Sequence, residues 1–191
     1  QQEYRLLAHM EDGALLETYR AQPRIDFHSM MQSKIKAAVG MDISRQTAKV
    51  LNFGILYGMG VGKLSEALKV DTATATRLKQ AQRSAAPGVQ ALDRELKRRA
   101  RDGEPIRTWG GRLYFCETPA EDGRTFEYRM LNYLIQGSAA DVTKEALIRH
   151  AETTETGRLL VTIHDEINVS SPIKKSVKED SILRDAMESI E

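Results

Sequence analysis

Residues 45–58 read RQTAKVLNFGILYG, and four of their side chains recur at every fourth position: Arg45, Lys49, Phe53 and Tyr57. Residues four apart lie one above the other on an α-helix, so this spacing predicts a helix over 45–57 with one strip of cations followed by aromatics. Anions are favoured at a helix start, and about 12 Å separates Arg45 from Phe53 at 1.5 Å per residue. The strip therefore suits a phosphate followed by a stacked base or sugar. The alternative is an amphipathic surface helix with solvated cations and buried aromatics.

The composition limits the class of protein. The chain has 191 residues, 41% of them hydrophobic, which is enough for a packed core and argues against a disordered chain. The single cysteine, Cys116, excludes an internal disulfide framework and a Cys-rich zinc module, and it fits a reducing, cytoplasmic location. No stretch approaches the roughly 20 apolar residues of a membrane helix, so we expect no membrane partner.

Charge is distributed unevenly along the chain. The net charge is +1, but residues 20–112 hold 18 Lys and Arg against 8 Asp and Glu, while the remainder is acidic. A basic segment of this size indicates a phosphate-rich partner, and the acidic remainder offers carboxylates for cations. The alternative is two solvated faces of opposite sign.

Helical and β-prone patterns alternate in blocks. Helical patterns cover residues 2–20, 26–39, 45–57, 63–85, 89–102 and 128–151, and a last helix begins near Ser176. Ser44 is the expected N-cap of the third helix, and Pro87-Gly88 is expected to break the chain. Runs at 159–163 and 167–170 predict an antiparallel hairpin with His164-Asp165-Glu166 at its tip. We therefore expect an α+β fold that is predominantly helical, with a helical block inserted into a smaller α+β unit.

Several motifs then point to one family. The R-x-x-x-K-x-x-x-F-x-x-x-Y-G pattern of residues 45–58 resembles the fingers helix of family A DNA polymerases, the group of bacterial DNA polymerase I and its phage relatives. Residues 1–5 (QQEYR) are similar to the end of its first palm motif, D-x-S-Q-x-E-x-R, and Asp26-Phe27-His28 to its D-x-H segment. Residues 132–141 (NYLIQGSAAD) resemble its N-x-x-x-Q-G-[ST]-A-A-D helix, and residues 164–166 its H-D-E hairpin. The resemblance implies palm at 1–11, fingers at 12–127 and palm again at 128–191.

The family carries out template-directed DNA synthesis, so the resemblance implies dNTPs and primer–template DNA as partners and two Mg²⁺ ions as cofactors. Asp165 is expected to hold metal, with Glu166 as an auxiliary acid and Lys49 as proton donor to pyrophosphate. The family's other metal aspartate lies three residues before the position of Gln1. We therefore expect a truncated polymerase that is inactive alone, from a bacterial cell or a phage-infected host. The sequence identifies no processivity partner.

Further roles carry over by position. The expected nucleotide-binding residues are Glu3, His28, Arg45, Lys49, Phe53 and Tyr57. The expected DNA-binding residues are Arg5, Asn132, Gln136 and His164. Tyr128 departs from the family pattern, because an arginine often stands there, and Arg129 lies one step later.

Two other functions remain open. One is a non-catalytic nucleic-acid-binding module that uses the helices at 45–57 and 89–102. The hairpin carboxylates argue against it, since a binder gains nothing from acids beside DNA phosphates. The other is a single-subunit RNA polymerase, which shares the Lys and Tyr-Gly spacing; Glu3 and Phe53 favour the DNA enzyme. The glycine run 58–62 lacks the spacing of a phosphate loop.

Overall fold

The computed structural model describes residues 2–190, apart from the side chain of Ile55; Gln1, the first residue of the QQEYR motif, lies outside the described residues. The helices are α1 (Gln2–Glu11), α2 (Ala14–Ala21), α3 (Phe27–Val39), α4 (Arg45–Leu56), α5 (Val61–Leu68), α6 (Thr72–Ser84), α7 (Pro87–Arg101), α8 (Met130–Thr153) and α9 (Ser176–Glu188). The strands are β1 (Ile106–Arg107), β2 (Leu113–Tyr114), β3 (Arg158–Ile163) and β4 (Glu166–Ser170). Each pair forms a small antiparallel hairpin. The predicted α+β, predominantly helical fold is confirmed.

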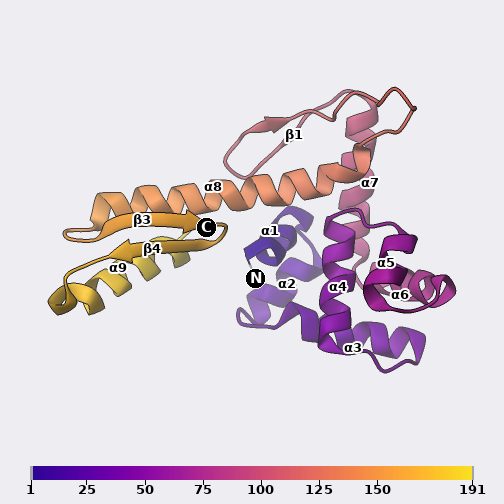
Figure 1. Cartoon of the computed structure of the whole chain (residues 1–191), viewed down its shortest axis with the longest axis horizontal. Helices are drawn as coiled ribbons and strands as arrows, with labels where there is room; N and C mark the ends of the chain where they lie inside the picture. The colour runs from indigo at the N-terminus through magenta and orange to yellow at the C-terminus, as the bar shows by residue number, and fades with distance from the viewer. Residues whose placement is uncertain (1, 191) are drawn as a thin grey trace.

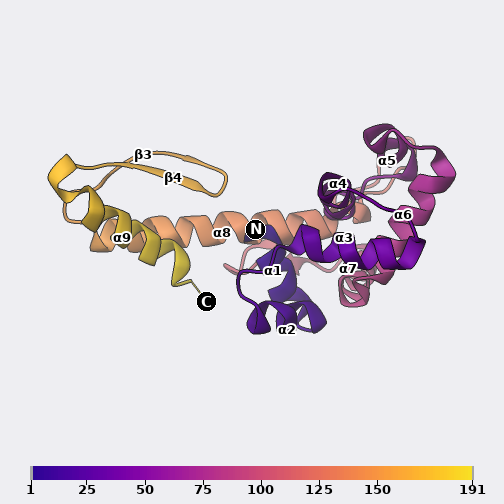
Figure 2. The ribbon, with the colours of Figure 1, turned by 90° about the horizontal axis from the view of Figure 1, so that it is seen from below.

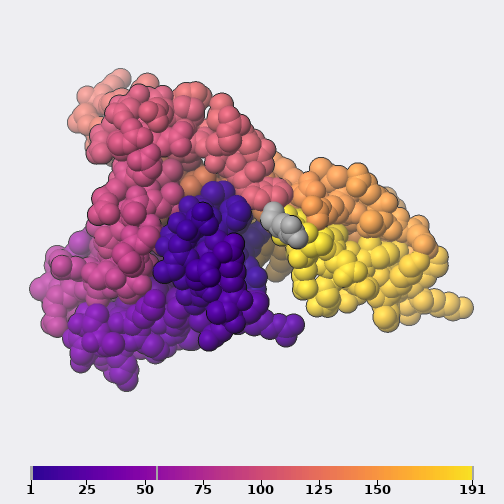
Figure 3. All heavy atoms as spheres, turned by 180° about the vertical axis from the view of Figure 1, so that it is seen from behind, coloured from indigo at the N-terminus to yellow at the C-terminus, as the bar shows by residue number. Residues whose placement is uncertain are grey.

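Helix α8 is the axis of the molecule (Figure 1). Its 24 residues extend about 36 Å at 1.5 Å per residue. Helices α1 to α7 lie around its first half, whereas the β3–β4 hairpin and α9 lie along its second half (Figure 2). From behind, an open notch separates the indigo and purple N-terminal lobe from the yellow C-terminal lobe (Figure 3). Among the described helices, none is long and apolar enough to cross a membrane.

The helical pattern over 2–20 is two helices, so a single helix there is wrong. Asp12 adopts a left-handed conformation (φ 47°) between α1 and α2. The Glu11 carboxylate accepts hydrogen bonds from the N–H groups of Gly13 and Leu15, both at 3.1 Å. These bonds satisfy donors at the start of α2. The break turns α2 away, and α1 remains packed on α8.

Local capping places α3 and α4. The Asp26 carboxylate accepts the His28 N–H (3.1 Å) at the start of α3, and the Ser44 hydroxyl accepts the Thr47 N–H (3.0 Å) at the start of α4. The predicted Ser44 cap is therefore confirmed. Helix α4 ends before Gly58, whose φ of 64° suits a residue without a Cβ. The buried core joins α3, α4 and α6 through Ile35, Leu51 and Leu78.

Two boundaries differ from expectation. The break between helices lies at Ala85 and Ala86, directly before Pro87 and not at Pro87-Gly88. Pro87 is the first residue of α7, where proline's missing N–H costs nothing. At the hairpin tip, Glu166 pairs with Ile163 as the first residue of β4, so the turn consists of His164 and Asp165 alone. The tip is therefore shorter by one residue than predicted.

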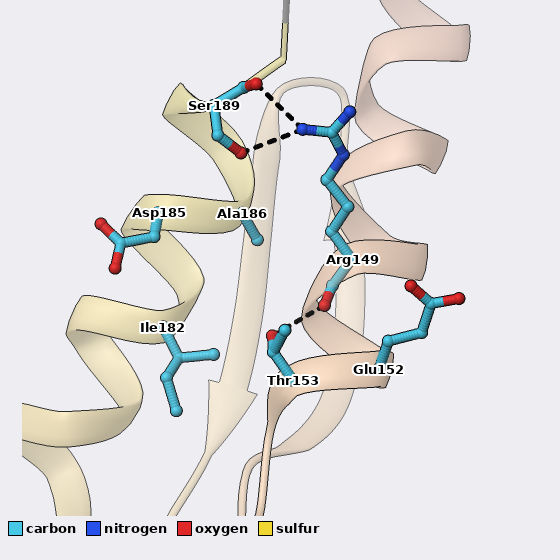
Figure 4. A pocket seen from close by; sticks show the side chains of 7 residues that line it. All are labelled: Arg149, Glu152, Thr153, Ile182, Asp185, Ala186 and Ser189. Carbon is cyan, nitrogen blue, oxygen red and sulfur yellow. Dashed lines mark hydrogen bonds between the residues drawn. The ribbon is translucent and has the colours of Figure 1, made fainter.

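Two contacts attach neighbouring segments to the long helix. The loop around β1 and β2 docks on α8 because buried Asp141 accepts from the Thr108 hydroxyl (2.5 Å) and pairs with Arg112 (2.7 Å). Further along, Arg149 of α8 donates to the carbonyl (2.9 Å) and hydroxyl (3.0 Å) of Ser189, just after α9 (Figure 4). A pocket between α8 and α9 lies beside this contact.

Gly137 of α8 permits the close approach of this loop. A Cβ at Gly137 would lie 2.7 Å from Thr108 Cγ2 and 3.2 Å from Tyr114 Cε2. We expect Gly137→Ala to lower the free energy of unfolding by about 1–3 kcal/mol, because overpacking forces the loop away from Asp141. Urea unfolding measures the change.

Gly60→Ala is the matched control, since a Cβ there meets nothing within 4 Å and φ is −69°. Thr108→Ser removes the nearest methyl group and should restore part of the stability lost in Gly137→Ala. Equal stability of the Gly137 and Gly60 variants would contradict this account of the loop.

Candidate active site

The predicted strip on α4 is present, and its members lie in order. The Phe53 and Tyr57 rings stack with centroids 6.1 Å apart, and Lys49 Nζ lies 5.9 Å from the Phe53 centroid. Lys49 is exposed and forms no ion pair with any residue among 2–190. Its ammonium is therefore available to an anion beside an aromatic surface.

Arg45 is held at the start of α4 by a neighbouring carboxylate. Its Nε lies 2.5 Å from Asp26 Oδ2, and the hydrogen bond with Arg45 is the largest cause of the lowered pKa of Asp26. The same carboxylate accepts the Ser29 hydroxyl (2.7 Å). Since both partners are partly exposed, water weakens the pair, and an anion can compete for the guanidinium.

His28 stands on the first turn of α3, facing the strip. Its ring centroid is 5.8 Å from that of Phe53, and Tyr4 of α1 contacts both rings edge-on at 5.0 and 5.6 Å. Burial lowers the pKa of His28, and Arg45 and Lys49 lower it further, against the opposing effect of Asp26. His28 is therefore neutral near neutral pH and can donate a hydrogen bond without carrying charge.

Gln136 connects the end of the strip to two other helices. Its Nε2 donates to the hydroxyl of Tyr57 (3.2 Å), which directly follows α4, and to the Glu3 carboxylate on α1. Burial raises the pKa of Tyr57, and the charge of Glu3 raises it further. Three motifs that are far apart in sequence therefore meet at the side chain of one α8 residue.

The β3–β4 tip lies against the middle of α8, close to the start of α1 in both ribbon views (Figures 1 and 2). The Thr143 hydroxyl lies 3.4 Å from the His164 carbonyl oxygen, and Gln2 Nε2 lies 3.5 Å from the Thr143 hydroxyl. His164 has a φ of 54°, which turns the chain sharply. Asp165 and Glu166 are exposed, so their carboxylates face solvent.

The tip carboxylates suit a hard cation in kind. Mg²⁺ prefers carboxylate oxygens and retains waters. Within residues 2–190, however, no group of three or more His, Cys, Asp or Glu side chains is arranged to hold a metal. Asp165 and Glu166 can therefore supply part of a Mg²⁺ site, and further ligands must come from water, substrate or elsewhere.

Three predicted DNA-binding residues lie outside the group formed by the α4 strip, Gln136 and Glu3. The Arg5 guanidinium donates to the Pro23 carbonyl and lies 5.6 Å from the Tyr19 centroid, so it is engaged with α2. Asn132 stands one turn before Gln136, and its Nδ2 has no hydrogen-bond partner among the described residues. The His164 side chain is exposed at the hairpin tip.

Arg129 does not take up a position on the strip. It stacks on Phe126 at 4.6 Å and pairs with Glu117 at 2.9 Å. These contacts hold it at the start of α8 beside the β1–β2 segment. The arginine that follows Tyr128 is therefore engaged with Phe126 and Glu117, away from the strip.

Sequence reasoning missed two buried amides behind the strip, Asn52 and Gln82. Asn52 is 1% exposed and Gln82 5% exposed, and they bond to each other at 3.2 Å. The available signal was an asparagine directly after Leu51 on the apolar side of α4, because a polar side chain on a buried helix face requires a partner.

Comparisons with known proteins point to the same family as the sequence motifs. The family model of DNA polymerase family A matches residues 1–191. The DNA polymerases of Mycobacterium phages L5 and D29 are 35% and 36% identical, each over 92% of this chain and 27% and 28% of the relative. DNA polymerase I of Mycobacterium tuberculosis H37Rv is 30% identical over 97% of the chain and 22% of its own length.

Among solved structures, the POL domain of Pol1 from M. smegmatis, in complex with DNA primer-template and dNTP, superposes with a TM-score of 0.86. It is 25% identical, and the match covers 99% of this chain and 35% of that chain. The chain thus spans about a quarter of the length of the curated relatives. Since the family model covers every residue, the chain belongs to DNA polymerase family A.

Proposed function

We propose that this chain forms the nucleotide-binding face and part of the catalytic centre of a template-directed DNA polymerase. The observation that carries the proposal is the continuous strip from Lys49 through Phe53 to Tyr57, joined by Gln136 to Glu3. The hairpin tip contacts α8 at Thr143, about two turns beyond Gln136. The proposed partners are dNTPs and primer–template DNA, in the cytoplasm of a bacterial or phage-infected cell.

The triphosphate is proposed to lie along the start of α4. Lys49 and Arg45 then neutralise phosphate oxygens, His28 donates a hydrogen bond, and Phe53 stacks on the base or sugar. Tyr57 lines the nascent base pair, and Glu3 excludes a ribose 2′-hydroxyl. The cations and the hydrogen-bond donor thus meet the phosphates, and the aromatic surface that follows them meets the sugar and base.

The reaction forms a bond between the primer 3′-oxygen and the α-phosphorus, and it breaks the bond to pyrophosphate. Lys49 is placed to give a proton to the departing pyrophosphate. Asp165 is the proposed Mg²⁺ ligand, with Glu166 beside it. When bound, the ion supplies charge neutralisation at the reacting phosphate. Arg5, Asn132, Gln136 and His164 are proposed DNA contacts.

The proposed division is palm at 1–11 and 128–191, with fingers at 12–127. The contacts that support it run from Gln2, Glu3 and Tyr57 to α8, so the strip and the hairpin share one axis. The non-catalytic module is less well supported. On the basic helix α7, Lys97 and Arg98 are paired with Asp93 and Glu95 at 2.6 and 2.7 Å, so fewer charges remain for DNA.

Lys49→Ala tests the phosphate contact. We expect dNTP affinity of the chain to fall about tenfold, since an exposed hydrogen bond to a charged group is worth about 1.5 kcal/mol. Titration calorimetry measures the affinity. Lys63→Ala, another exposed lysine on α5, is the control and should leave affinity unchanged. Equal losses in both variants would indicate nonspecific attraction only.

Glu3→Ala tests the sugar contact. We expect discrimination against ribonucleotides to fall about tenfold or more, because the side chain that excludes the 2′-hydroxyl is removed. The assay compares dNTP and rNTP incorporation by a chimaera in which this chain replaces the matching region of phage D29 polymerase. Unaltered discrimination would show that Glu3 does not meet the sugar.

Asp165→Asn tests the metal ligand in the same chimaera. We expect incorporation to fall about a thousandfold or more while primer–template binding persists, since the amide keeps the shape and loses the charge. Asp185→Asn, on the exposed face of α9, should retain full activity. Retained turnover in the Asp165 variant would refute its catalytic role.

A further inference from the structure

A buried line of amides ends at His28. Gln82 Nε2 donates to Asn52 Oδ1 at 3.2 Å, and Asn52 Nδ2 lies 3.1 Å from His28 Nδ1. The three residues come from α6, α4 and α3. Asn52 and Gln82 are nearly fully buried, whereas His28 is only half-buried and faces the strip.

The direction of these bonds fixes the proton on the imidazole. An amide NH₂ group can only donate, and an amide oxygen can only accept. Because Asn52 Oδ1 receives the Gln82 donor, the group that Asn52 turns to His28 is its NH₂. His28 Nδ1 must then be the acceptor, so the ring proton resides on Nε2. Among residues 2–190, the hydrogen bond of the imidazole is made at Nδ1 with Asn52, which leaves the Nε2 proton for a ligand.

We propose that Asn52 and Gln82 are positioning residues that hold His28 as the neutral Nε2–H tautomer, with this N–H as a preset donor to a phosphate oxygen of the incoming nucleotide. The inference rests on the proposed function for the identity of the ligand. Neither amide touches the nucleotide; each acts through the next side chain. Lys49 and Arg45 supply the positive charge, and His28 supplies direction.

The surroundings of the ring support this assignment. Tyr4 and Phe53 contact the imidazole at 5.0 and 5.8 Å, which limits its rotation. The lowered pKa of His28 favours the neutral ring. Protonation would place an N–H on Nδ1 opposite the Asn52 NH₂. That pair of donors could be relieved only by an amide flip, which breaks the bond from Gln82.

Two variants alter the line without removing His28. Gln82→Met keeps the side-chain length but removes the donor that orients Asn52, so both amide orientations become accessible. Asn52→Asp replaces the donor with a carboxylate, which requires an N–H on Nδ1 and raises the pKa of His28. Gln80→Met is the matched control, because Gln80 is exposed on the same helix.

Imidazole nitrogen chemical shifts in the isotope-labelled chain read the tautomer directly, and His28→Gln identifies the signal among the four histidines. We expect protonated Nε2 and bare Nδ1 in the wild type and in Gln80→Met. Gln82→Met should give a mixture of tautomers, and Asn52→Asp a protonated Nδ1. A wild-type ring with its proton on Nδ1, or a tautomer unchanged in Gln82→Met, would overturn the proposal.

Nucleotide affinity supplies the second readout. We expect Gln82→Met to weaken dNTP binding several-fold, with Gln80→Met unchanged. If the tautomer shifts and affinity does not, the positioning role for binding is overturned. If the wild type binds no dNTP while Lys49→Ala is equally inert, the proposed function fails; the nitrogen shifts still decide whether the amides set the tautomer.

Discussion

The amide of Gln136 is the contact on which the arrangement depends. One NH₂ group reaches both the Tyr57 hydroxyl and the Glu3 carboxylate, so α4 and α1 are fixed against α8. An amide has two donor hydrogens, and both are used here. The position of the α4 strip relative to the hairpin tip therefore follows from α8. This helix contacts Tyr57 through Gln136, and it contacts the His164 carbonyl through Thr143, about two turns later.

The two cations of the strip differ in whether a carboxylate neutralises them. Arg45 is paired with Asp26, whereas Lys49 has no carboxylate partner among residues 2–190. An arriving anion therefore meets an unneutralised ammonium and a guanidinium that is only weakly retained. The basic helix α7 shows the opposite condition, because Arg98 contacts Glu95 and Asp102. The basic character of residues 20–112 is thus available to an anion at α4, whereas carboxylates on and beside α7 partly neutralise it there.

Much of this fold follows from the sequence because its signals are local. The fourfold spacing of residues 45–57, the Ser44 cap and the β-prone runs depend on neighbours within one turn or one strand. The split between α1 and α2 did not follow, because the Glu11 side-chain cap and the left-handed conformation of Asp12 are not shown by apolar periodicity. The turn at His164 lost one residue for the same reason: strand register is set by pairing.

The candidate site also contains residues that the sequence predicted and residues that it did not. Lys49, Phe53 and Tyr57 were predicted from residue type and spacing, and Glu3 and His28 from the family resemblance. The structure brings these five residues together. Asn52 and Gln82 were missed because their role depends on a contact across 30 residues. Arg5 was placed by motif, whereas Arg129 was noted only as one step after a position where the family often has arginine. Both guanidiniums follow the nearest oxygens and aromatic faces. Long polar side chains are located by packing, which sequence alone does not specify.

We propose that the nucleotide binds along α4, facing the hairpin tip. Backbone amide shifts of the isotope-labelled chain, recorded during titration with a dNTP, test it most directly. We predict that the largest shifts fall at His28, Lys49 and Phe53, with smaller ones at Gln136 and none along α9. Shifts concentrated on α7, or spread evenly over the basic surface, would contradict it.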